Sequence, residues 1–195
     1  MLGNLAIPID GFTETGIGDR YAPKGTNEHH NVATAAYRPG TIIEYYNERL
    51  DGYGACIYLK YDSGAGPVAA AAGLVATLYI SAEDHYTVTC DSSDGILGGK
   101  AALCLSVITD TYYGWFWCKG VCPDINIAAD SSYAENADLT TDGDVAAGEV
   151  IMASTDGVVD TYAGTNAGLP LGQTLAADTG TDLAAENVYL FPMWG

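Results

Sequence analysis

The sequence predicts an all-β protein, either an antiparallel sandwich or a small barrel, with an extended N-terminal arm. Short runs of β-branched and aromatic residues recur along the chain, and glycine-containing turns separate them. The composition agrees, because the 195 residues include 24 glycines and 14 tyrosines. Strands at this spacing, joined by such turns, are typical of sandwiches and barrels.

The arm is predicted over residues 1–38 and the β-rich body over residues 39–195. Proline and glycine interrupt both regular periodicities in the first segment, from Pro8 onwards. A structureless stretch of this length is unusual inside a compact domain. Two interpretations stay open, a flexible tail and a segment laid along a partner. The Ile, Leu, Phe and Tyr content of the arm favours the partner.

The first part of the body alternates between apolar strands and turns. In the second predicted strand, Ile57, Leu59 and Tyr61 share one face. The stretch from 68 to 80 is ambiguous, because four consecutive alanines suit a helix but Gly73 interrupts them. A strand from about residue 74 is favoured there. The predicted strands of this part are 41–46, 55–61, 74–80, 86–90 and 101–108.

The densest aromatic block of the chain, residues 112–123, is predicted to contain the central strand of the body. Alternation along a strand places Trp115 and Trp117 on one face and Phe116 and Cys118 on the other. Exposed aromatic rings on one face would form a sugar-stacking platform. For a run with aromatic residues on both faces, a core combined with a subunit interface is favoured.

Strands are also predicted on both sides of this block. Before it, Leu103, Leu105 and Val107 are expected to share one face of the strand. After it, Gly120 permits a tight turn or a bulge, and residues 125–128 are expected to pair back as a partner strand. An Asp-Gly hairpin signal joins the first two of the remaining strands. These remaining strands are 150–154, 158–162, 168–176 and 187–191.

The charge balance restricts the classes of partner. The chain has 7 Lys and Arg against 25 Asp and Glu, a formal net charge of −18. Too few cations are present to neutralise a run of phosphates or to dock on an anionic membrane, so neither nucleic acid nor membrane is an expected partner. The first residues have no positively charged region or long apolar core, and we expect the chain to fold in a cytoplasm.

No catalytic, cofactor or metal site is predicted, and we do not expect an enzyme. Of the three histidines, His29 and His30 lie in the arm, and His85 is expected to be a solvated surface residue. Acidic clusters at 142–144 and 178–182 resemble turn chemistry more than calcium loops. The five cysteines are expected to be small buried hydrophobes. They are Cys56, Cys90, Cys104, Cys118 and Cys122.

The order of glycine-based motifs in the second half resembles a known family. An aromatic strand, Gly114–Gly120, is followed by Gly-x-Val-x-x-Gly at 143–148 and by Asp-Gly-Val-Val at 156–159. A Gly-x-x-Leu-Gly-x-x-Leu motif at 168–175 then leads to an apolar terminal strand. This order is similar to that of the capsid decoration, or cement, proteins of tailed bacteriophages. The resemblance covers about residues 112–191.

The resemblance implies a structural protein that binds the outside of a phage head and stabilises the major capsid lattice. It implies the major capsid protein as partner, a homo-oligomer with a trimer favoured, and a virion location after assembly in the host cytoplasm. The alternative is a carbohydrate-binding or host-adhesion β module that uses Trp115 and Trp117. The candidate residues for a capsid or subunit interface are Phe12, Tyr21, Tyr37, Trp115 and Trp117.

Overall fold

The computed structural model is all-β, as the sequence predicts, and contains no α-helix among the residues that it describes. The described part of the chain likewise holds no helix that could span a bilayer. The described residues are 30–47, 52–80, 82, 84–95, 100–126, 150–153, 157, 159–161, 170–174, 185–190 and 194.

Five strands close into a barrel, which decides between the two predicted architectures. Their order around the barrel is β2–β4–β3–β5–β6, and β6 pairs with β2 to close the ring. The β2–β4 pair is parallel, and the other four pairs are antiparallel. The bounds are β2 (Gly52–Tyr61), β3 (Val75–Leu78), β4 (Thr87–Thr89), β5 (Ala101–Cys104) and β6 (Tyr113–Asn126).

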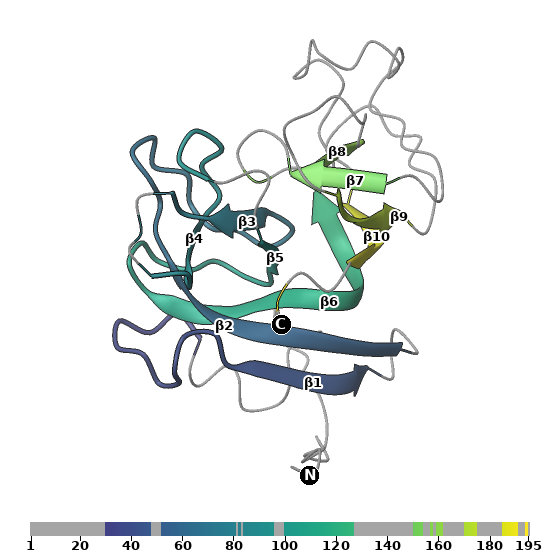
Figure 1. Cartoon of the computed structure of the whole chain (residues 1–195), viewed down its shortest axis with the longest axis horizontal. Helices are drawn as coiled ribbons and strands as arrows, with labels where there is room; N and C mark the ends of the chain where they lie inside the picture. The colour runs from purple at the N-terminus through teal and green to yellow at the C-terminus, as the bar shows by residue number, and fades with distance from the viewer. Residues whose placement is uncertain are drawn as a thin grey trace.

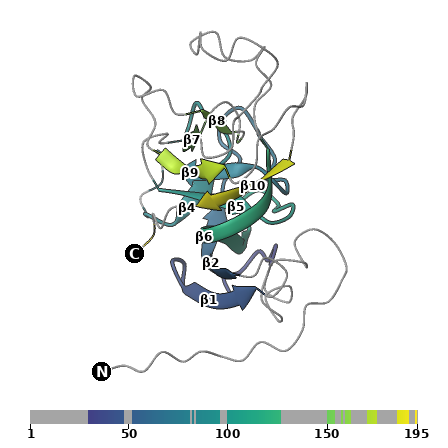
Figure 2. The same cartoon turned by 90° about the vertical axis from the view of Figure 1, so that its right-hand side faces the viewer.

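Strands outside the ring extend the sheet at both ends. The first, β1 (Ile42–Asn47), pairs with the start of β2. At the other end β6 bends away from the barrel, and its second half continues the sheet in the order β6–β10–β9–β7–β8 (Figures 1 and 2). The added strands are β7 (Val150–Ala153), β8 (Val159–Thr161), β9 (Pro170–Thr174) and β10 (Ala185–Leu190). The predicted Asp-Gly hairpin is confirmed as the β7–β8 pair.

The barrel interior is filled by alternate residues of its strands, because successive side chains point to opposite faces. Ile57, Leu59 and Tyr61 from β2 belong to the buried core cluster, as the sequence predicts, and Phe116 and Cys118 from β6 join them. The buried Trp194 adds to the same cluster, and its indole N–H donates to the carbonyl of Ala101 (2.7 Å).

Two of the predicted strand boundaries are wrong. The strand predicted over 101–108 ends at Cys104, and Val107 is 62% exposed instead of sharing a face with Leu103. The reason is that both of its ladders end there, because Leu103 faces Val75, the first residue of β3, and Cys104 opposite Phe116 is the last pair with β6. Residues 125 and 126 do not start a partner strand, because β6 runs unbroken to Asn126.

The continuation of β6 depends on a bulge and a glycine. The register between β2 and β6 shifts so that Cys118 is an extra residue between Trp117 and Lys119. Gly120 then adopts a φ of +88°, which favours glycine. A Cβ at this position would lie 2.3 Å from the carbonyl oxygen of Tyr53. Of the two predicted roles for Gly120, the structure shows the bulge, which bends β6 without ending it.

Candidate functional site

The aromatic block forms a second packed layer on the outside of the barrel wall. On the face of β2 and β6 that points away from the interior, Tyr58, Tyr113 and Trp115 lie together, and Tyr37 packs over them. The ring centroid of Trp115 is 5.0 Å from that of Tyr58 and 5.2 Å from that of Tyr37. The Tyr58 and Tyr113 rings are stacked at 6.2 Å. We call Tyr58, Tyr113 and Trp115 the outer aromatic cluster.

Residues 30–41, which we call the N-terminal strap, lie along this cluster. Val32 and Tyr113 exchange two backbone hydrogen bonds, at 3.1 and 2.9 Å. The amide of Ala36 donates to the Tyr58 hydroxyl (3.2 Å), and the amide of Gly40 donates to the Tyr58 carbonyl (2.7 Å). Burial under the strap raises the pKa of the Tyr58 phenol. Part of the predicted arm therefore packs on the chain's own barrel.

The predicted interface residues differ in how exposed they are in the structure. Trp115 and Trp117 share one face of β6, as predicted, but both are 0% exposed, so neither indole ring is available to a sugar or to a partner in this conformation. Tyr37 is 37% exposed and contacts Trp115. Phe12 and Tyr21 lie outside the described residues. The block is thus an internal packing element in the single chain.

The indole of Trp115 carries an energetic cost. No described residue accepts a hydrogen bond from its buried Nε1–H. A buried donor without an acceptor costs about 1–3 kcal/mol. The ring contacts with Tyr37 and Tyr58 offset this cost, because aromatic pairs contribute about 0.5–1.5 kcal/mol beyond area burial. The outer aromatic cluster is therefore held more by packing than by polar contacts.

His30 is the polar residue that ties the strap to β6, and sequence reasoning missed it. Its Nδ1 accepts a hydrogen bond from the backbone N–H of Trp115 (3.0 Å), and its Nε2 lies 2.5 Å from Ser106 Oγ. A backbone N–H can only donate, so Nδ1 bears no proton and the proton of the neutral ring is on Nε2. No local sequence signal marks this contact, because Ser106 and Trp115 are both more than 70 residues away.

The His30–Ser106 pair does not form a catalytic dyad. A serine nucleophile needs a histidine nitrogen that accepts its hydroxyl proton. Here Nε2 carries a proton and donates to Ser106 Oγ, since Nδ1 is occupied as the acceptor for Trp115 N–H. His85, the other described histidine, is exposed as predicted. The two hydrogen bonds of His30 therefore have a structural role and hold the strap against β6 and Ser106.

The acidic loop beside the barrel is organised by hydrogen bonds to Asp91 from backbone amides and a serine hydroxyl. Asp91, 3% exposed, accepts hydrogen bonds from the amide and hydroxyl of Ser93 (2.9 and 2.6 Å) and from the amide of Gly66 (2.9 Å). These bonds, the Ser93 hydroxyl first, hold the pKa of Asp91 below its usual value. Among the described residues, no group of three or more His, Cys, Asp or Glu could hold a metal ion. The clusters at 142–144 and 178–182 fall outside this part.

The described cysteines are buried and form no disulfide with one another, which confirms their prediction as small buried hydrophobes. Cys90 and Cys104 approach to 3.6 Å between sulfur atoms in the barrel interior. Burial raises the pKa of Cys118 to about 12 and that of Cys104 well above its ordinary value. These two thiols are therefore protonated near neutral pH and are poor nucleophiles. The side chain of Cys122 lies outside the described part.

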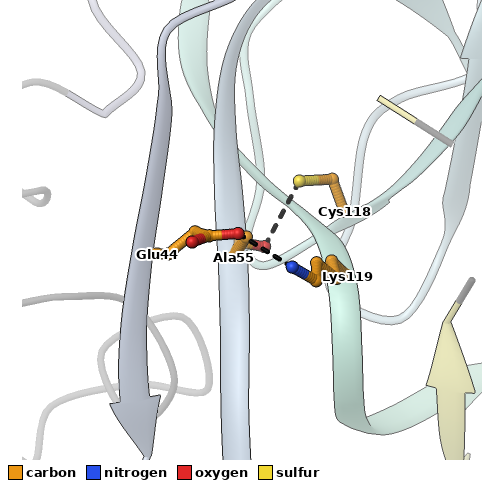
Figure 3. A network of polar contacts seen from close by, with 4 residues as sticks. All are labelled: Glu44, Ala55, Cys118 and Lys119. Carbon is orange, nitrogen blue, oxygen red and sulfur yellow. Dashed lines mark hydrogen bonds and ion pairs between the residues drawn. The ribbon is translucent and has the colours of Figure 1, made fainter. Parts of the chain in front are cut away.

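One charged contact marks the point where β6 leaves the barrel. Lys119 Nζ lies 2.8 Å from Glu44 Oε1, and the pair spans β2 above the small side chain of Ala55 (Figure 3). The thiol of Cys118 donates to the Ala55 carbonyl (3.4 Å). The bond to Glu44 raises the pKa of Lys119. Both charged side chains are partly exposed, so this contact adds little stability.

Comparisons with known proteins give no match. No protein-family model fits the chain, and no curated protein or solved structure is significantly similar to it.

Proposed function

We propose that this chain is a structural protein that binds the outside of a tailed-phage head and stabilises the major capsid lattice. The observation that carries the proposal is the pairing of the strands that hold the family-like motifs. Within residues 112–191 the described strands form one continuous sheet in the order β6–β10–β9–β7–β8. The described strands of the segment that resembles decoration proteins are thus neighbours in one sheet.

Three residues of those motifs have packing roles in the described part of the chain, and the motif at 143–148 lies outside that part. Gly157 adopts a φ of +82°, and a Cβ there would lie 3.0 Å from the Cβ of Leu74 and 3.2 Å from that of Cys90. Because Gly157 has no Cβ, the turn between β7 and β8 can pack closely against Leu74 and Cys90 of the barrel. Leu171 and Val159 are 1% and 0% exposed. The motifs therefore support a rigid β body, which suits a mechanical function.

The mode of binding follows from symmetry and from the exposed surface. In a lattice, many modest contacts from identical subunits add up to firm attachment. The indoles of Trp115 and Trp117 are buried and do not supply these contacts in this conformation. Large apolar side chains at Tyr53, Ile80 and Val107 are 76%, 65% and 62% exposed. We expect the major capsid protein or a second copy of this chain to cover part of this surface, with a trimer as the favoured assembly.

Sedimentation with capsids tests the proposal. The full chain is mixed with empty heads of the phage that encodes it, and bound protein is measured after pelleting. Light scattering gives the solution mass in units of the 20.3 kDa chain. Saturable binding at a fixed ratio to the capsid protein, together with a trimeric mass, is the expected result. Absence of binding would overturn the proposal, and a positive glycan array on the same sample would favour the adhesion alternative.

Substitutions at exposed positions then locate the contact. Tyr53→Glu and Val107→Glu change well-exposed side chains, so neither is expected to unfold the protein. A charge in an apolar interface is costly, and the variant that lies in the contact should bind heads at least tenfold more weakly. Weak binding by one variant and normal binding by the other would identify the attached side. Normal binding by both would exclude these two positions.

A further inference from the structure

We propose that the N-terminal strap is a pH-operated latch over the outer aromatic cluster. Neutral His30 fastens the latch, and uptake of a proton by its imidazole releases it. This inference goes beyond the structural role proposed above and does not depend on it. It rests on the contacts of His30 and on the thin attachment of the rest of the strap.

The strap has few attachments other than His30. Residues 33–38 are all exposed, and Tyr37 provides the ring that lies on the cluster. Other hydrogen bonds between the described strap and the barrel are the backbone pair between Val32 and Tyr113, the bonds of Ala36 and Gly40 to Tyr58, the bond from the Tyr58 amide to the Thr41 carbonyl (2.9 Å), and a bond from the amide of Thr109 to Asn31 Oδ1 (2.7 Å). A segment with so little buried surface opens more readily than the barrel unfolds.

The position of His30 makes its protonation incompatible with the closed strap. Gly114 lets the ring approach β6, because a Cβ there would lie 3.0 Å from Nδ1. In the closed state Nδ1 accepts from Trp115 N–H at 3.0 Å, and the other nitrogen faces Ser106 Oγ. A proton on Nδ1 would place two N–H donors against each other. The charged ring would lose this bond, and the Trp115 amide would be left without its acceptor.

Among the described residues, the charged and titratable groups on the strap and on the segments that contact it come from three elements. On the loop after β5 the group is Asp110, which is exposed and accepts from the amide of Ser63 (2.8 Å). On β6 it is Tyr113, and on the strap the groups are Tyr37 and Arg38. Asp110 is the one carboxylate among these described groups, and a negative charge close to an imidazole favours its protonated form. Its contribution is separated from that of His30 by substitution.

The direction of the pH effect follows from which state binds the proton. The closed strap holds the neutral ring, while the open strap leaves the imidazole free to titrate near pH ~6.5. The open population therefore rises as pH falls below this value, by at most about tenfold for each pH unit. Opening removes Tyr37 from Trp115 and Tyr58 and exposes an aromatic face that is covered at neutral pH.

Amide hydrogen exchange on the full ¹⁵N-labelled chain tests the latch at single residues. The protection factor of the Trp115 amide, which corrects for intrinsic exchange, should fall about tenfold between pH 7.5 and 5.5. The amide of Ile57 in β2 is the internal reference and should keep its protection. No change at Trp115 would overturn the proposal. Equal loss at both amides would also overturn it, because it would show unfolding of the barrel in place of a local release.

Three variants assign the effect to His30. Asparagine places its Oδ1 where Nδ1 lies and does not titrate, so His30→Asn should give the same Trp115 protection at both pH values. His85→Asn replaces an exposed histidine and should retain the wild-type change. Asp110→Asn keeps an oxygen for the Ser63 amide and should also retain it. A pH-dependent His30→Asn protein, or a pH-independent His85→Asn protein, would contradict the latch.

Discussion

The two faces of β6 are equally buried but are covered in different ways. On the inner face, Phe116 packs in a core to which all five barrel strands contribute. On the outer face, Trp115 is as fully buried, yet it is covered in part by Tyr37, a residue of the short strap that is itself 37% exposed. Fractional exposure does not distinguish these cases. What differs is how much of the molecule must move before the ring meets water.

This difference separates the stability of the barrel from the accessibility of its outer face. Exposing Phe116 requires the ring of strands to open, which is a global event in a small closed barrel. Exposing Trp115 requires release of a segment that is held by a few hydrogen bonds and by the ring contacts of Tyr37 with Tyr58 and Trp115. Regions of low local stability are where proteins place their moving parts. The following predictions test the contrast, beginning with the inner face.

Phe116→Ala should have the largest effect. Removing a fully buried phenylalanine from a core typically costs about 3–5 kcal/mol in the free energy of unfolding. Denaturant unfolding followed by circular dichroism measures this loss. Tyr53→Ala, at a residue that is 76% exposed, is the control and should change stability by no more than about 0.5 kcal/mol. A loss below about 1 kcal/mol for Phe116→Ala would show that the inner face is not the tightly packed one.

Gly120→Ala should have the second-largest effect on stability, because this glycine lets β6 leave the barrel and continue the sheet towards β10. A left-handed φ of +88° costs a residue with a Cβ about 1–2 kcal/mol. The 2.3 Å approach to the Tyr53 carbonyl adds a steric term. We expect a total loss of about 2 kcal/mol or more in the same unfolding assay. Gly120→Asn tolerates the φ better but keeps the clash, so it should not recover wild-type stability, and full recovery would contradict the steric account.

The sequence predicted the local elements better than their connections. Alternation placed Ile57, Leu59 and Tyr61 on the interior face, and an Asp-Gly turn predicted the β7–β8 hairpin. These features depend on neighbours within a few residues. Closure of the barrel depends on the parallel β2–β4 pair and on β6 pairing with β2, contacts across 27 to 66 residues that no local pattern records.

The candidate site shows the same limit. The alternation of Trp115 and Phe116 across the strand was predictable, but which face would be covered by the strap was not. That cover depends on His30 reaching the Trp115 amide and on Gly114 leaving room for the ring. A histidine followed by Asn-Val-Ala-Thr-Ala-Ala carries no signal for such a contact. The strap therefore could be recognised only in the folded chain.

Tyr37→Ala should have a moderate effect that is confined to the outer face. It removes ring contacts with Tyr58 and Trp115, each worth about 0.5–1.5 kcal/mol. Because the ring is partly exposed and the strap regains some freedom, we expect a net loss of about 1 kcal/mol in the free energy of unfolding. Hydrogen exchange should increase at Val32 and Trp115 and stay unchanged at Ile57. Increased exchange at all three would indicate that the strap supports the whole barrel.

Glu44→Gln should have the smallest effect on the free energy of unfolding, because it removes an ion pair on the surface of the protein, outside both buried faces of β6. The Glu44 and Lys119 side chains are 63% and 42% exposed, so solvent screens their attraction. Surface pairs of this kind contribute about 0–1 kcal/mol, and the loss should shrink further at high salt. Thermal unfolding at low and high ionic strength measures both values. A salt-insensitive loss above about 1 kcal/mol would mean that the pair is desolvated and that the bend in β6 is fixed by charge as well as by Gly120.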